Sequence, residues 1–278
     1  MSDTPTTDEL LQLRFDDAPR EVPDAPDGDV WHTIANHQSC RSYANTPLSR
    51  ELVQQLCALA FCSPTKSDLQ QRDIIIVEDS EKRAVIDGLF PGSPWIADAP
   101  VFLVFCGNNR RLRQIHEHHG HPFENDHLDA FFNAAVDAGI ALSAFVNAAD
   151  AAGLGTCPIS TIRDHLEVIN ELLELPDWVF PVAGMTLGWP GRTPRVNLRL
   201  PLAATVHTDT YDEAAQWSAI EAYDLRRTEL RPYGSQRDPE RFGMCNPYTW
   251  SEDKARQYAD PQRTDFGSYV RGKGFDLS

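Results

Sequence analysis

Uninterrupted apolar runs are the strongest structural signal along the chain. They lie within residues 73–79 (DIIIVED), 99–107 (APVFLVFCG) and 178–189 (WVFPVAGMTLGW). A strand with one solvated face alternates apolar and polar residues, so continuous runs predict strands that are covered on both faces. A shorter segment, 155–160 (GTCPIS), is predicted to be a short strand or a loop.

Helical spacing of apolar residues fills most of the chain between these runs. In residues 48–63 the apolar side chains recur every three or four positions, and Ser49 is a suitable N-cap. A long helix is expected from Leu128 to Ala152, with Gly153 as its C-terminal glycine. Other helices are predicted at 30–37, at 80–90 with Ser80 as cap, and at 108–119, 161–175 and 211–230. Helices and strands mix without a regular βαβ order, which favours a layered α+β fold.

The termini differ in character from the middle of the chain. Residues 1–28 are acidic and rich in proline, without the basic and apolar regions of a signal peptide, and are expected to be a poorly ordered extension. The folded core is predicted at 29–210. Residues 211–278, a helix followed by an arginine-rich tail, form a C-terminal extension.

Charge and cysteine content narrow the class of protein. The net charge of −16 over 278 residues argues against nucleic acid or an acidic membrane surface as a partner. The long helix carries Asp129, Asn133 and Asp137, so it is expected in a soluble core and not in a membrane. Six cysteines without a C-x-x-C pair indicate reduced thiols in a cytoplasmic protein.

Common catalytic and metal motifs are absent from the sequence. There is no dinucleotide-binding G-x-G-x-x-G after a strand, no Walker A loop, no G-x-S-x-G elbow and no H-E-x-x-H. Four histidines lie in residues 116–122 (HEHHGHP). We interpret them as part of a solvated loop, because no carboxylate or cysteine completes a rigid ligand set. A metal-binding protein is the alternative. No metal site is expected.

Three polar clusters remain as candidates for ligand binding. His37, Ser39 and Arg41 alternate, so an extended backbone would place them on one side, where they suit a phosphate monoester. Ordinary loop polarity explains them equally well. The segment 63–71 (SPTKSDLQQ) suits either a phosphate or the edge of a planar heterocycle, and Arg199 either completes a dianion site or is a surface charge.

These clusters, in this order, resemble the FMN-dependent nitroreductase family, and within it the NADPH-dependent, oxygen-insensitive nitroreductases and flavin reductases with a C-terminal extension. The resemblance implies a three-layer fold with a mostly antiparallel central sheet flanked by helices, a two-fold homodimer, and a core that binds FMN. By resemblance, the following residues contact FMN: His37, Gln38, Ser39, Arg41, Thr65, Lys66, Ser67, Gln70, Pro158, Ile159, Ser160, Thr161, Asn197 and Arg199.

The C-terminal segments resemble the extension of the NADPH-dependent branch. The resemblance implies that Arg263 and Lys66 polarise the substrate and that Arg231 and Arg237 contact NADPH or NADH. Several positions depart from the family pattern. Asn197 stands in place of a lysine, Ser93 in place of a flavin-contacting glutamine, and Tyr233 in place of an arginine proposed to bind the NADPH 2′-phosphate. Ser160 and Thr161 replace a glycine pair, and Asp68 stands where asparagine is common.

The implied activity is two-electron, ping-pong reduction of nitroaromatics, quinones or similar electron-poor acceptors by NAD(P)H. Flavin N5 carries the hydride, so no side chain is expected to be catalytic. Two alternatives stay open. One is a different flavin enzyme on this scaffold: a reductive dehalogenase, a flavin-destroying enzyme, or a flavin reductase that supplies free reduced flavin. The other is a non-catalytic protein that binds a ligand or a metal.

Overall fold

The structure is a computed structural model that describes residues 4–19, 28–192 and 195–278. It consists of two compact units. The first joins Met1–Asn36 to Val196–Gln262, and the second joins His37–Arg195 to Arg263–Ser278. These units divide the chain differently from the boundaries expected at residues 28 and 210. The division into a cofactor-binding core and a substrate-side extension stays a prediction.

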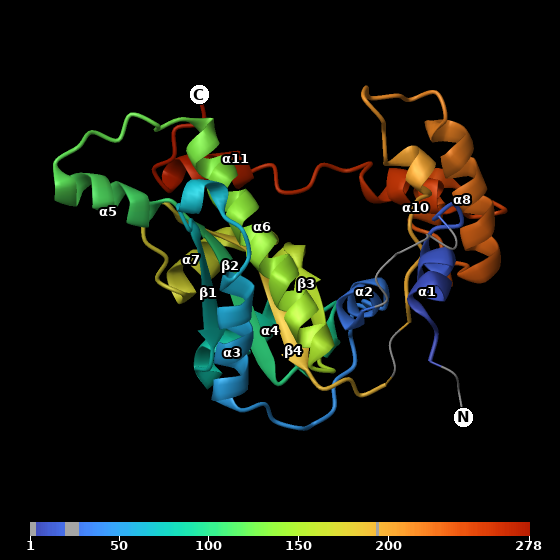
Figure 1. Cartoon of the computed structure of the whole chain (residues 1–278), viewed down its shortest axis with the longest axis horizontal. Helices are drawn as coiled ribbons and strands as arrows, with labels where there is room; N and C mark the ends of the chain where they lie inside the picture. Colours follow the sequence, from blue (N-terminus) through green and yellow to red (C-terminus); the bar gives the residue numbers. More distant parts are fainter. Residues whose placement is uncertain (1–3, 20–27, 193–194) are drawn as a thin grey trace. The chain divides into compact units, whose positions relative to one another are not determined.

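A four-stranded antiparallel sheet forms the centre of the second unit (Figure 1). Its strands are β1 (Arg72–Val77), β2 (Val101–Asn108), β3 (Gly155–Ile159) and β4 (Val179–Gly188). They lie in the order β1-β2-β4-β3. The three strands predicted from apolar runs are confirmed, and residues 155–159 form a strand and not a loop. The α+β fold with a mostly antiparallel sheet is also confirmed.

The strand pairing explains the apolar runs in the sequence. Central β2 pairs with β1 through Ile75 and Val104, and with β4 through Phe102 and Thr186. Every residue of β2 after Val101 is buried. Side chains on both sides of this strand lie in apolar surroundings, so no polar alternation is needed.

Two helices, α3 (Arg50–Phe61) and α6 (Leu128–Ala151), cover one face of the sheet (Figure 1). Phe145 of α6 and Leu56 of α3 pack with Phe105 of β2 in one apolar cluster. Ser49 caps α3 by accepting from the N–H of Leu52, as predicted. The helix α6 ends before Gly153, whose φ of 73° is the left-handed conformation that a C-terminal glycine supplies.

The other face is covered by α4 (Ser80–Gly88) and α7 (Leu166–Leu172), which complete the third layer. Two predictions fail here. Asp79, and not Ser80, caps α4, because its carboxylate accepts from two N–H groups of the first turn. The single helix expected at 161–175 is divided at His165 into a 3₁₀ turn (Ser160–Asp164) and α7. The remaining helices of this unit are α5 (Arg110–His119) and α11 (Phe266–Gly272).

Among the described residues, α6 is the one helix that is long and apolar enough to cross a membrane by length and composition. Its buried alanines and Phe145 instead pack against the sheet. The apolar composition of α6 is thus explained by its place in the core of the second unit.

The first unit is helical. It contains α1 (Thr7–Arg14), α2 (Asp29–Ala35), α8 (Gln216–Leu230), α9 (Pro239–Phe242) and α10 (Trp250–Gln257). The expectation of a poorly ordered N-terminus is wrong for Thr7–Arg14. A capping box between Thr6 and Glu9 begins α1, and Leu10 is buried with Ala35 and Val196. The helix α8 begins at Gln216 and not at Tyr211 as expected.

Candidate functional site

The segment His37–Arg41 runs as extended backbone beside β3. Ser39 forms a parallel bridge with Thr156, and the N–H of Cys40 donates to the carbonyl of Thr156 over 2.8 Å. Cys40 is buried at 1% exposure, whereas Arg41 is exposed. That His37, Ser39 and Arg41 lie on one side of the chain stays a prediction.

The side chains of this segment are held in different ways. His37 Nδ1 lies 2.6 Å from Oδ2 of Asp150, in the last turn of α6, so a carboxylate orients the imidazole. The guanidinium of Arg41 lies over the ring of Trp95, 5.6 Å from its centroid. No carboxylate forms an ion pair with Arg41 within the described part of the chain. Its charge can therefore balance an anion.

Two buried thiols lie behind this segment. Burial raises the pKa of Cys157, and Arg41 opposes the shift. Burial likewise raises the pKa of Cys40 above the ordinary value of a thiol. Both cysteines therefore stay protonated at neutral pH and serve as packing groups. Gly155 is required beside them, because a Cβ there would lie 2.5 Å from the Cβ of Cys40.

The polar loop 63–71 is fixed by one carboxylate. Asp137 of α6 is fully buried, and its Oδ1 and Oδ2 accept the N–H groups of Lys66 and Gln71, each over 3.0 Å. Ser67, Asp68 and Gln70 have positive φ values of 49°, 58° and 52°. Such strained conformations persist only where the surroundings enforce them. Sequence reasoning missed Asp137, which looked like a polar residue of a soluble helix.

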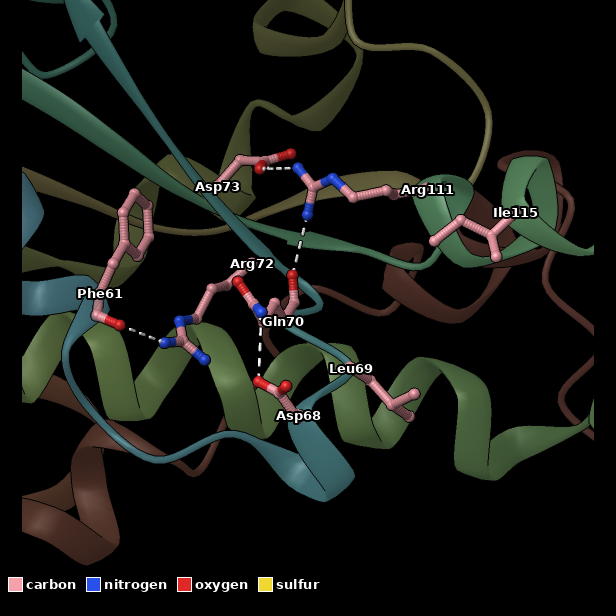
Figure 2. A pocket seen from close by; sticks show the side chains of 8 residues that line it. All are labelled: Phe61, Asp68, Leu69, Gln70, Arg72, Asp73, Arg111 and Ile115. Atoms are coloured by element: carbon pink, nitrogen blue, oxygen red, sulfur yellow. Dashed lines mark hydrogen bonds and ion pairs between the residues drawn. The ribbon is translucent and has the colours of Figure 1, made fainter.

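Part of the loop's polarity is used within the loop. Thr65 Oγ1 accepts the N–H of Gln70 over 2.9 Å, and the side-chain amide of Gln70 donates to Asp68 over 3.1 Å. Figure 2 shows Gln70 and Asp68 at the edge of a cavity, whose volume is about 360 Å³. The cavity is lined by Phe61, Asp68, Leu69, Gln70, Arg72, Asp73, Arg111 and Ile115.

Two arginines of that cavity have structural partners. Arg72 donates to the carbonyls of Phe61 and Ser63, at the C-terminus of α3, where a cation is favoured. Arg111 joins the Asp73 carboxylate to the Gln70 carbonyl. Figure 2 shows the Arg72 guanidinium turned toward Phe61, and the Arg111 guanidinium turned toward Asp73 and Gln70. They position the end of the loop at the start of β1.

The predicted flavin-facing segment Pro158–Thr161 is only partly exposed. Pro158, Ser160 and Thr161 are exposed at the end of β3. Ile159 is 4% exposed, and its side chain belongs to the apolar cluster on the α4 and α7 face. Its backbone, and not its side chain, is therefore available to a ligand.

The segment at His37 and the loop 63–71 lie near different parts of α6. Asp150 holds the first and Asp137 holds the second. At a rise of 1.5 Å per residue, these aspartates are separated by about 20 Å along the helix axis. Within one copy of the second unit, the segment His37–Arg41 and the loop 63–71 therefore lie apart.

Two predicted cofactor residues lie in the first unit. Arg199 is exposed, its N–H donates to the carbonyl of Arg14 over 2.8 Å, and its Nη1 donates to the carbonyl of Leu198. The carbonyl of Asn197 accepts from Nη1 of Arg14, which is 4% exposed. Sequence reasoning missed Arg14, because it lies in the segment expected to be disordered. The convergence of Arg199 with His37, Ser39 and Arg41 stays a prediction.

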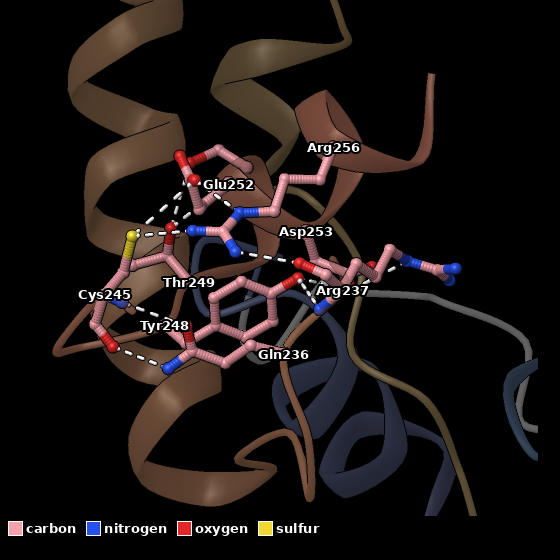
Figure 3. Close-up of polar contacts among 9 residues, drawn as sticks. Gln236, Arg237, Cys245, Tyr248, Thr249, Glu252, Asp253 and Arg256 are labelled. Carbon is pink, nitrogen blue, oxygen red and sulfur yellow. Dashed lines mark hydrogen bonds and ion pairs between the residues drawn. The ribbon is translucent and has the colours of Figure 1, made fainter. Parts of the chain in front are cut away.

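The two arginines predicted to contact NAD(P)H are engaged within the first unit. Nε of Arg237 donates to Oδ1 of Asp253 over 3.0 Å, and Tyr248 donates to the same oxygen (Figure 3). The carbonyl of Arg231 accepts from Arg227, whose guanidinium also lies 4.1 Å from the ring centroid of Tyr233. A phosphate would have to share Arg237 with Asp253.

The remaining candidates also have defined neighbours. Nε of Arg263 lies 2.7 Å from the Asp164 carboxylate, and Lys66 Nζ lies 3.7 Å from that of Asp129. His116 and His119 lie within α5. No group of three or more His, Cys, Asp or Glu side chains that could hold a metal ion occurs in the residues the structure describes.

Comparisons with known proteins agree with this fold. Residues 34–189 match the model of the nitroreductase family, and residues 198–278 match that of its C-terminal domain. An FMN reductase [NAD(P)H] of Bacillus subtilis is 37% identical over 72% of this chain and 82% of its own length.

Solved structures show the same similarity over nearly the whole chain. The Bacillus megaterium protein NfrA2 has a TM-score of 0.81 and 31% identity, covering 90% of this chain and 99% of that one. The NADPH:FMN oxidoreductase of Vibrio harveyi, in complex with NAD⁺, has a TM-score of 0.77 and 28% identity, covering 89% and 98%.

Proposed function

The chain belongs to the nitroreductase family, and we propose that it is an NAD(P)H-dependent FMN oxidoreductase that reduces nitroaromatics, quinones or related electron-poor acceptors. The names of the relatives support FMN as cofactor and NAD(P)H as electron donor. The observation in this chain that carries the proposal is Arg41, an exposed arginine with no carboxylate partner among the described residues, beside an oriented imidazole.

The donor set at His37–Arg41 fits the phosphate of FMN. It combines the Arg41 guanidinium, the Ser39 hydroxyl and the His37 ring, in a protein whose net charge is −16. An anion is held there by local charge-assisted hydrogen bonds, because the protein as a whole repels it. Arg199, which is also exposed and has no carboxylate partner among the described residues, supplies the second cation of the proposed site.

The loop 63–71 fits the edge of the flavin ring. When bound, FMN supplies two-electron hydride chemistry between NAD(P)H and the acceptor. The chain's own contribution is rigidity, because Asp137 fixes the backbone on both sides of the strained residues Ser67 and Asp68. Hydrogen-bond donors held in one place need no reorganisation during the reaction.

A two-fold homodimer completes the proposed site. The two polar groups are separated by about 20 Å along α6, and a second copy could bring its loop 63–71 to the first copy's His37–Arg41. Leu128, Phe132 and Val136 form an apolar row along α6, at exposures of 50%, 59% and 40%. An isologous interface would cover such a row on both copies at once. The proposal places this dimer in the cytoplasm.

The proposed enzyme takes its electrons from NADPH or NADH. Arg237 is 47% exposed and already paired with Asp253, whose carboxylate competes with a 2′-phosphate. Arg231 and Arg263 complete the proposed substrate side. A function as flavin reductase that releases reduced flavin is the second candidate, supported by relatives named FMN reductase.

A binding and turnover experiment tests the proposal. Purified protein is expected to bind FMN and to oxidise NADPH or NADH when menadione or a nitrobenzene is added. Arg41→Ala should weaken FMN binding about 10- to 100-fold, because a charge-assisted hydrogen bond is lost. Arg50→Ala, which removes an exposed arginine paired with Glu78, is the matched control. A purified protein that does not retain added FMN would contradict the proposal. Turnover with free FMN but not with the other acceptors would favour the second candidate.

A further inference from the structure

The N-terminal helix α1 lies outside the part of the chain that matches the nitroreductase family. It ends at Arg14, whereas the match to the family model begins at residue 34. Membership of the family therefore assigns no role to this helix. Within the first unit, however, its last residue contacts the two segments that precede His37 and Arg199 in the sequence.

The buried side chain of Arg14 joins these two segments. Arg14 is 4% exposed; its Nε donates to the carbonyl of Ala35 over 2.6 Å, and its Nη1 donates to that of Asn197 over 3.1 Å. Ala35 is the last residue of α2, where carbonyls lack partners within the helix and a cation is favoured. Since a buried charge is costly without hydrogen bonds, the guanidinium stays at these acceptors and holds both segments at a fixed separation.

The backbone of Arg14 makes a third contact with the same region. Its carbonyl accepts from the N–H of Arg199 over 2.8 Å. On either side of this bond the segment alternates. Val196 and Leu198 are buried at 7% and 6%. Asn197 and Arg199 are exposed. Such alternation is typical of an extended segment with one packed face, so Arg14 fixes the register at which the Arg199 side chain leaves that face.

The helix α1 is itself held by the rest of the first unit. Nη2 of Arg226, on α8, donates to the carbonyls of Gln12 and Leu13 over 3.0 and 2.7 Å. Leu10 is 2% exposed and belongs to one buried apolar cluster with Val196. The helix is therefore a fixed part of this unit and can position the segments that it contacts.

We propose that Arg14 is a positioning residue for the phosphate of FMN, a role that rests on the proposed function. By holding Asn197 and the N–H of Arg199, it presents the Arg199 guanidinium to the phosphate. By holding Ala35, it fixes the point from which the chain continues to His37. Arg14 itself does not touch the phosphate, because its guanidinium is buried against the two carbonyls.

FMN and riboflavin are matched probes for this role, because they share the flavin ring and the ribityl chain but only FMN carries a phosphate. The oxidised whole protein, without NAD(P)H, is titrated with each flavin, and quenching of flavin fluorescence gives the two dissociation constants. Arg14→Met removes both side-chain donors and is expected to weaken FMN binding about tenfold, the value of one charge-assisted hydrogen bond lost at Arg199. Riboflavin affinity should stay unchanged, because riboflavin makes no phosphate contact.

Three further variants separate positioning from a folding defect. Arg14→Lys keeps a cation and N–H donors near the two carbonyls and should restore FMN affinity. Arg226→Gln leaves Arg14 in place but releases the carbonyls of α1, and should also weaken FMN binding without affecting riboflavin. Arg241→Met is the matched control: it removes a 52% exposed arginine of the same unit, paired with Asp260, and should change neither affinity.

The binding data distinguish failure of this role from failure of the proposed function. A wild-type protein that binds neither flavin contradicts the proposed function and the role of Arg14 with it. If wild type binds FMN, then equal losses of FMN and riboflavin affinity in Arg14→Met, or no loss of either, overturn the role of Arg14 alone. If Arg14→Met does not fold, an Arg226→Gln protein with unchanged FMN affinity overturns it.

Discussion

At the scale of single residues, one buried carboxylate determines the shape of the most polar loop. Asp137 accepts two backbone N–H groups that flank three residues with positive φ. Without these acceptors, the strained conformations of Ser67 and Asp68 would relax toward ordinary regions. A fully buried side chain therefore holds the backbone of the candidate site in place.

Asp137→Asn should destabilise the protein by about 1–3 kcal/mol, because an amide offers one acceptor where the carboxylate offers two. The free energy of unfolding in urea measures this change, and FMN affinity should fall as well if the proposed function holds. Asp129→Asn is the control, since that carboxylate is 52% exposed and touches the same loop only through the Lys66 side chain. Equal stability of the two variants would contradict the role assigned to Asp137.

At the scale of elements, an ion pair and one aromatic contact attach α5 to the segment before α6, and a second aromatic contact attaches it to Trp178, immediately before β4. Arg113 of α5 pairs with Asp126 and packs between Phe123 and Trp178. Hydrogen bonding from Arg113 lowers the pKa of Asp126 below its ordinary value of 3.8. The charged form is therefore favoured in the folded state.

This shift predicts a pH-dependent contribution to stability. Since the folded pKa of Asp126 lies below the unfolded one, the stabilisation is present above about pH 4 and is lost as the pH falls through the folded pKa. The difference in unfolding free energy between wild type and Asp126→Asn should accordingly be largest near pH 7 and shrink in acid. Glu124→Gln, at an exposed neighbouring carboxylate, should show no such trend. A difference that is constant from pH 7 to pH 3 would rule the ion pair out.

At the scale of the whole molecule, the proposed site needs more than one chain. The row of Leu128, Phe132 and Val136 lies on α6. The same helix holds the segment His37–Arg41 through Asp150 and the loop 63–71 through Asp137. A partner that covers this row would lie beside the part of α6 whose Asp137 holds the loop 63–71. Dimerisation and cofactor binding should therefore be lost together.

Phe132→Glu should shift the protein toward monomers and reduce the FMN bound per chain, because a charge would be buried in the interface. Sedimentation equilibrium and flavin absorbance measure the two effects. Val85→Glu is the control: Val85 is 44% exposed on α4, in the layer on the opposite face of the sheet. A Phe132→Glu protein that stays dimeric with full flavin content would refute the interface on α6.

Local patterns in the sequence determined the elements and the layers. The apolar runs predicted β1, β2 and β4, because burial on both faces removes alternation, whereas residues 155–160 were predicted to be a short strand or a loop. Ser49 and Gly153 marked helix ends by their chemistry. The period of two in extended backbone also led to the prediction that His37, Ser39 and Arg41 lie on one side of the chain.

The tertiary structure alone decided which polar residues act together. Asp137, Arg14 and Gln71 are far in sequence from some of the groups they hold, and no local period reveals such contacts. Nor does the sequence show that α6 separates the two polar groups proposed to bind one cofactor, because that distance exists only once the helix is formed and packed. Chain-local propensities specify elements, whereas long-range packing specifies the site.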